Sequence, residues 1–109
     1  MATTRKCLGQ SNPSAATLTD AYTVPASTQA TVSSLVVCNR SATATTFRIS
    51  VAIAGAANDN KQYLYFDTNI PGNDTFIATV GLTLAATDVI RVYATLATLS
   101  FGFFGIEVT

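Results

Sequence analysis

The sequence predicts an all-β protein, a single antiparallel β-sandwich of about seven or eight strands with no significant helix. Three observations lead to this fold class. Apolar and polar residues alternate with a period of two in most segments, no segment shows a helical period, and turn-forming residues recur at short, even spacing. The alternation does not decide between an immunoglobulin-like sandwich and a jelly roll, so both topologies stay open.

We divide the chain of 109 residues into an N-terminal arm or short strand, residues 1–14, and a β-sandwich domain, residues 15–109. The opening residues include Arg5 and Lys6, but no apolar segment follows them, so we do not expect a signal peptide. No apolar run in the sequence is long enough to predict a transmembrane span.

Residues 16–24 and 31–38 are the next two predicted strands. In the first of them, Leu18, Tyr22 and Val24 share one face. In the second, both faces are apolar, which is typical of a central strand that is covered at least in part on both sides.

The following strand is predicted over residues 46–53, after a turn of small and polar residues. Its alternation turns Arg48 and Ser50 outward. We therefore predict that the chain from Ser33 to Val51 forms a β-hairpin. The side chains expected to face the core are those of Phe47, Ile49, Val51 and Ile53.

Residues 62–70 are predicted as a strand that ends at a strong turn signal, Pro-Gly-Asn-Asp. We expect Leu64, Phe66 and Ile70 on its core side. Tyr63 and Tyr65 then lie on the opposite side.

Three more strands are predicted over residues 75–84, 88–96 and 99–108. In the last, the apolar pattern changes phase partway, which predicts a β-bulge between Gly102 and Gly105. In the strand before it, Arg91 and Tyr93 are expected to look outward. The core-facing residues predicted for the first two are Phe76, Ala78, Val80, Leu82, Leu84, Ile90, Val92, Ala94 and Leu96.

The composition limits the partners of this chain. Apolar residues make up 49% and charged residues 11%, and six basic residues balance six acidic ones. Nucleic acids and anionic membranes attract proteins through basic patches, so we expect neither as a partner. A net charge near zero gives little electrostatic repulsion between molecules. We therefore expect protein partners to cover much of the surface. The two cysteines form no zinc pattern, and we expect free, mostly buried thiols.

The sequence lacks the usual groups for catalysis. It contains no histidine and a single glutamate, Glu107. Most aspartates stand in or beside turns, where local capping of the backbone is the usual role. We therefore predict no catalytic residue, no cofactor and no metal site. A loop calcium site is the alternative, with oxygen ligands from Asn58, Asp59, Asp67 and Asp74.

The segment Cys38-Asn39-Arg40 is the one cluster that resembles a reactive site. A reactive thiolate needs a nearby cation, and Arg40 is close in sequence. Cys38, however, continues the apolar face of Val32 and Val36, so we interpret it as a small buried hydrophobe at the end of a strand. Asn39 then begins the turn, and Arg40 is a solvated or partner-facing charge.

The outward aromatic side chains indicate an interface, because exposed tyrosines with a neighbouring arginine are enriched in protein contacts. A second buried face is the alternative for these rings. Arg5 and Lys6 are further candidates for the interface, because the N-terminal segment that carries them could reach an adjacent subunit. The interface candidates are Tyr63, Tyr65, Arg91, Tyr93, Arg5 and Lys6.

Several segments resemble a small β-sandwich module of structural proteins from tailed bacteriophages and prophages. They are a Val-Pro start at Val24, the strand ending Val-Val-Cys-Asn, the turn Ile-Pro-Gly-Asn-Asp, a Thr-Leu-rich strand, the strand Ile-Arg-Val-Tyr-Ala and the end Gly-Ile-Glu-Val-Thr. The resemblance covers residues 18–109. Each motif alone is also ordinary strand and turn sequence.

The resemblance implies a virion structural protein without enzymatic residues. A capsid decoration (cement) protein is the expected role, and a tail or fibre component or a carbohydrate-binding module are the alternatives. The implied partners are the major capsid protein or other virion proteins, and further copies of the chain in a homo-oligomer. The implied location is the virion, assembled in the cytoplasm of the host bacterium.

Overall fold

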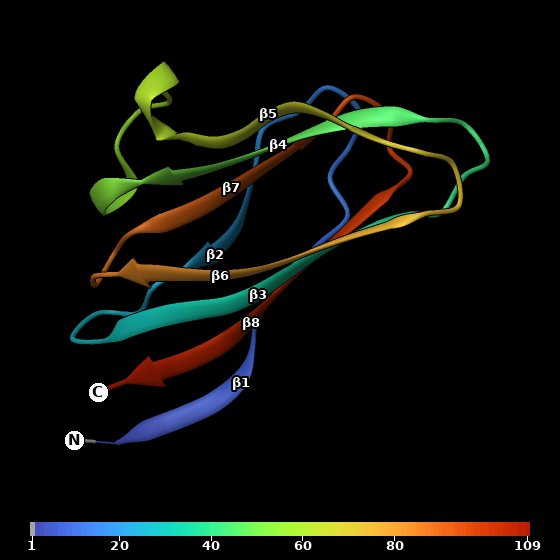
Figure 1. Ribbon diagram of the computed structural model, residues 1–109. Coiled ribbons are helices and arrows are strands. Elements are labelled where there is room, and N and C mark those ends of the chain that lie inside the picture. Colours follow the sequence, from blue (N-terminus) through green and yellow to red (C-terminus); the bar gives the residue numbers. More distant parts are fainter. Residues whose placement is uncertain (1) are drawn as a thin grey trace.

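The computed structural model describes residues 2–109, and this part of the chain forms eight strands in two packed antiparallel sheets, confirming the predicted sandwich (Figure 1). Two short 3₁₀ turns stand between the fourth and fifth strands. Among the described residues, no helix is long and apolar enough to span a bilayer. The elements are β1 (Thr3–Ser11), β2 (Thr19–Thr23), β3 (Gln29–Asn39), β4 (Thr45–Ala52), η1 (Ile53–Gly55), η2 (Asn60–Gln62), β5 (Tyr63–Ile70), β6 (Thr75–Leu84), β7 (Val89–Ala94) and β8 (Leu99–Val108).

The strand order shows that the sandwich is a jelly roll and not an immunoglobulin-like fold. One sheet has the order β1-β8-β3-β6 and the other β2-β7-β4-β5. The first strand pairs with the eighth, the second with the seventh, the third with the sixth and the fourth with the fifth, as in a long hairpin that is rolled up. An immunoglobulin-like sandwich pairs several consecutive strands, whereas here β4 and β5 are the only consecutive pair within residues 2–109.

The core lies between the sheets and is filled from both of them. Its largest fully buried side chains include Phe47 and Ile49 from β4, Leu35 from β3, Phe103 from β8 and Ile90 from β7. Burial of each such side chain stabilises the fold by about 1.5–3 kcal/mol. Strand alternation therefore fixes which side of each sheet faces the core.

The N-terminal segment is part of the sandwich. β1 is an edge strand that pairs with β8, and Leu8 belongs to the core. Ala2 N donates to Thr109 O over 3.1 Å and Thr109 N donates to Ala2 O over 2.9 Å, so the start of β1 lies beside the end of β8 (Figure 1).

The predicted hairpin from Ser33 to Val51 is wrong. β3 pairs with β6 and β8, whereas β4 pairs with β5 and β7 in the opposite sheet. Residues 40–44 carry the chain from one sheet to the other. A strand-turn-strand pattern shows where strands are, but it does not show which strands pair.

The predicted bulge in the last strand is also misplaced. The register does shift beside Phe103 and Phe104, but the extra residues belong to the neighbours, between Cys7 and Gly9 in β1 and between Val32 and Ser34 in β3. β8 keeps its alternation, so Phe104 points away from the core.

Four further side-chain orientations differ from the prediction. Leu64 and Phe66 are 46% and 55% exposed, because β5 carries extra residues relative to β4. Ile53 is 75% exposed, because the strand ends at Ala52 and the chain turns through η1. Leu96 lies beyond the end of β7 and is exposed.

Candidate functional site

Asn39 holds three loops together at one end of the sandwich. Its side chain is buried, and its Nδ2 donates to Thr43 O over 2.9 Å and to Pro71 O over 3.1 Å. Its Oδ1 accepts from Ser41 N and from Thr98 Oγ1. Asn39 is thus a structural centre that fixes where the chain crosses between the sheets, and the sequence pattern indicated only the start of a turn.

The two neighbours of Asn39 do not form a reactive pair. Arg40 Nη2 donates to Asn12 Oδ1 over 2.9 Å and to Ala97 O over 3.1 Å. Cys38 is partly exposed on the outer side of β3, so its predicted burial is wrong. The arginine binds loops instead of activating the thiol, and the cluster is the end of a strand.

The buried turn carboxylate has a capping role. Asp88 Oδ1 accepts from Ala54 N and its Oδ2 accepts from Ala85 N, both over 2.9 Å. This pair of bonds ties η1 to the turn before β7. Two residues of the alternative calcium site already have partners. Asp74 Oδ1 accepts a hydrogen bond from Thr75 N, and Asp67 forms an ion pair with Arg48. In residues 2–109 no group of three or more His, Cys, Asp or Glu side chains could hold a metal ion.

An arginine lies between two aromatic rings on the outer side of the sheet that contains β4. The Arg48 guanidinium is 4.1 Å from the centroid of Phe66 and 4.4 Å from that of Tyr93. Its Nε and Nη2 donate to the two carboxylate oxygens of Asp67 over 2.7 and 3.3 Å. The hydrogen bonds that Arg48 donates to Asp67 raise the pKa of Arg48 above its usual value. The charge of Arg48 is therefore paired with Asp67 and lies against two rings, and these contacts hold the side chains in a rigid surface cluster.

Three of the predicted interface residues lie around this cluster. Tyr93 stacks on Arg48, and the Tyr63 ring contacts Phe66 with centroids 4.9 Å apart. Arg91 pairs with Asp20 over 3.1 Å and donates to the carbonyl oxygens of Gly55 and Ala56, at the end of η1.

Tyr65 does not face outward as predicted. Its ring packs on the core side, with centroids 6.1 Å from Phe47 and 5.4 Å from Phe76. The reason is the extra residue beside Asp67, whose left-handed φ of 49° shifts the alternation of β5.

The N-terminal cations lie on a different part of the molecule, in β1. Arg5 and Lys6 are both exposed, and Lys6 Nζ is 3.4 Å from Glu107 Oε1. Tyr22 donates to the other carboxylate oxygen of Glu107 over 2.6 Å. Desolvation by burial, with a further contribution from Glu107, raises the pKa of Tyr22 well above its usual range.

The outer side of β8, β3 and β6 is a surface that the sequence analysis did not predict as a contact site. β3 and β6 contain no charged residue, and the charged residue of β8, Glu107, bonds to Tyr22 from the opposite sheet. We call this side the uncharged face and define it by three cross-strand rows. The rows are Ser100–Cys38–Thr75, Gly102–Val36–Ile77 and Phe104–Ser34–Thr79.

The apolar side chains of the uncharged face are open to solvent. Ile77 is 66% and Phe104 36% exposed, and Val36 stands beside Ile77 in the middle row. A Cβ on Gly102 would approach the Phe104 ring to 3.1 Å, so the ring lies against this glycine. The absence of charge from two long strands was the signal in the sequence that could have shown this face.

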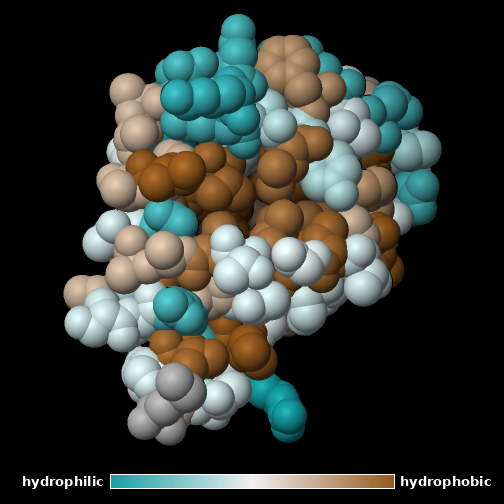
Figure 2. All heavy atoms as spheres, turned by 60° about the vertical axis from the view of Figure 1, so that its left-hand side comes forward, coloured by the Kyte–Doolittle hydropathy of each residue, from teal (hydrophilic) through white to brown (hydrophobic). Residues whose placement is uncertain are grey.

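Shallow hollows occur at the end of the sandwich that holds η1 and the C-terminal end of β8. Figure 2 shows apolar side chains in a band across this end, below a hydrophilic group. One hollow, of about 500 Å³, is lined by Val51, Ile53, Ala56, Lys61 and Gln62.

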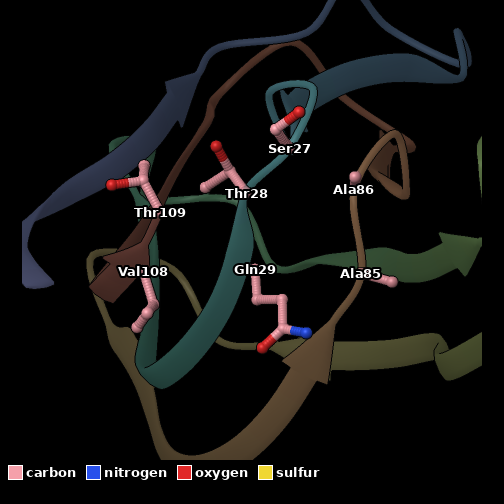
Figure 3. Close-up of a pocket in the computed structure, with 7 residues that line it drawn as sticks. All are labelled: Ser27, Thr28, Gln29, Ala85, Ala86, Val108 and Thr109. Carbon is pink, nitrogen blue, oxygen red and sulfur yellow. The ribbon is translucent and has the colours of Figure 1, made fainter. Parts of the chain in front are cut away.

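A second hollow, of about 340 Å³, lies by the C-terminus (Figure 3). Among the described residues, no charged side chain lines it. Its residues are Ser27, Thr28, Gln29, Ala85, Ala86, Val108 and Thr109.

Comparisons with known protein families, with curated proteins and with solved structures gave no match for this chain.

Proposed function

We propose that this chain is a non-enzymatic structural protein of a bacteriophage virion, and that it decorates the capsid through contacts made by its uncharged face. The observation that carries the proposal is the set of three rows across β8, β3 and β6, which contains no charged residue. The sequence resemblance to virion β-sandwich modules supports the same role.

The chemistry of the uncharged face favours protein contact. Centres of protein interfaces are depleted of charged residues, because a buried charge must be paired to offset its desolvation. Phe104 and Ile77 supply exposed apolar area, and the serine and threonine hydroxyls between them can bond to a partner. A sheet surface with these side chains suits repeated attachment to a protein lattice.

A charge placed on this face tests the proposal. We expect Phe104→Lys to fold as the wild type does but to bind purified particles about tenfold more weakly or worse. The matched control is Ile53→Lys, which alters an exposed apolar residue in η1 and leaves binding unchanged. Binding of Phe104→Lys at wild-type strength would overturn the assignment of this face.

Glycan binding is the second candidate, and a specific hollow favours it. Asn60, Tyr63 and Phe66 line a space of about 300 Å³ in which an exposed ring stands beside an amide. Rings that stack and amides that donate are the usual means of holding a sugar. If the hollow binds a glycan, replacing Tyr63 and Phe66 by alanine removes glycan binding and leaves particle binding intact. Tyr65 is unsuitable for this test because its ring packs on the core.

A further inference from the structure

The four edge strands of the sandwich differ in how they are protected. β1 carries Arg5 and Lys6, and β2 has five residues, including Asp20. β5 is interrupted by two register shifts and the left-handed Asp67. Charges, short length and bulges are the usual devices that keep an edge from pairing with another chain.

β6 lacks most of this protection. It has ten residues with neither charge nor proline, and within residues 2–109 it pairs with β3 alone. From Thr75 to Thr79 it follows the register of β3 without a break, and the irregularity comes later, around Val80 and Gly81. Its free edge therefore presents a regular five-residue run of unpaired backbone groups.

We propose that two copies of this chain pair edge to edge through β6, antiparallel and around a two-fold axis at Ile77. Antiparallel pairing of a strand with itself is self-complementary, as a two-fold interface requires. Ile77 then lies opposite Ile77 of the second copy, and Thr75 opposite Thr79. The pairing deepens the proposed assembly function, and rests on it, by naming a second copy as a partner.

The side chains of β6 favour a second copy as the occupant. A charged strand paired with itself would place like charges near each other, and β6 has none to repel. In this arrangement the exposed Ile77 side chains of the two copies lie opposite each other, with a threonine pair on either side of them. Cross-strand pairs of β-branched residues such as these stabilise sheets. The row Gly102–Val36–Ile77 would continue into the second copy, so two uncharged faces would join into one.

Disulfide trapping tests the register in the isolated protein. The background replaces both natural thiols, Cys7→Ser and Cys38→Ser, and Ile77→Cys is added. Directly opposite residues of an antiparallel pair have Cα atoms about 4.5–5.5 Å apart, within disulfide range. The matched control is Thr79→Cys on the same face, whose two copies would be about 13 Å apart along the strands.

We expect Ile77→Cys to form a covalent dimer under mild oxidation and Thr79→Cys to stay monomeric on a non-reducing gel. Wild-type protein should sediment as a dimer at high concentration, and Ile77→Lys as a folded monomer. Monomeric wild type, no disulfide in Ile77→Cys, or equal trapping of both variants would each overturn the proposal. Because no particle is present, these results are separate from the Phe104→Lys binding test.

Discussion

The hydroxyl of Tyr22 in β2 donates a 2.6 Å hydrogen bond to Glu107 in β8, and so joins the two sheets of the sandwich. Tyr22 is 8% exposed, and Lys6 approaches the same carboxylate from β1. One buried phenol therefore connects the edge strand of one sheet with the strand that carries the C-terminus in the other.

Removal of this hydroxyl should destabilise the fold. We expect Tyr22→Phe to lower the free energy of unfolding by about 1.5–3 kcal/mol, because the bond has a charged acceptor. Urea denaturation measures the change. Tyr93→Phe is the matched control, since it keeps the ring on Arg48, and an equal loss in both variants would contradict the role of the Tyr22 hydroxyl.

Alkaline pH should weaken the same contact. The pKa of Tyr22 is raised in the folded protein, so the unfolded chain loses this proton first. The stability that Tyr22 contributes is complete below the unfolded pKa of about 10 and falls as pH rises above it. We expect the stability difference between wild type and Tyr22→Phe to shrink in that range, as followed by urea titrations at successive pH values. A difference that grows with pH would contradict the assigned direction.

Asn39 should be the most sensitive polar residue of the loops. We expect Asn39→Ala to cost about 2 kcal/mol or more, because the carbonyls of Thr43 and Pro71 lose their donor in a buried place. Asn69→Ala, at an exposed position in β5, is the control and should change little. Chemical denaturation of both variants measures the two losses. Similar denaturation midpoints for Asn39→Ala and Asn69→Ala would refute the central role of Asn39.

Asp88 offers a graded test of backbone capping. Each carboxylate oxygen accepts from a different amide, so we expect Asp88→Asn to lose one bond and Asp88→Ala to lose both. The predicted losses are about 1 and 2–3 kcal/mol in thermal or urea unfolding. Equal losses in the two variants would show that the charge of Asp88, and not its two acceptor oxygens, matters at this position.

Two glycines in the same sheet should respond differently to replacement by alanine. A Cβ at Gly105 would collide with the backbone oxygen of Thr31, in the irregular part of β3, whereas a Cβ at Gly81 would meet nothing within 4 Å. We expect Gly105→Ala to unfold at a clearly lower temperature and Gly81→Ala to stay within about 0.5 kcal/mol of wild type. Equal melting temperatures would contradict the close approach of β8 to β3.

Local alternation predicted the strands well where the side chains keep alternating between core and solvent. β6 was predicted with its observed bounds and its core-facing side chains, because its pattern reports directly on one buried face. In β5 the insertion beside Asp67 reversed the faces of Tyr65 and Phe66, and an inserted residue leaves no mark in the alternation itself.

Pairing partners and contact surfaces were harder to predict, because both depend on distant residues. The phase change near Phe104 predicted a bulge in the last strand itself, whereas the bulges that keep Phe104 outward lie in β1 and β3. Asn39 bonds to loops that follow β3, β5 and β7 in the chain, a meeting that only the rolled topology brings about.

The copy number of this protein in purified virus particles tests the central claim most directly. Quantitative mass spectrometry against the major capsid protein gives that number. The proposed decoration role predicts a ratio near stoichiometric, whereas a ratio lower by one or two orders of magnitude would move the protein to the tail or a fibre. Absence from the particle would contradict the virion assignment altogether.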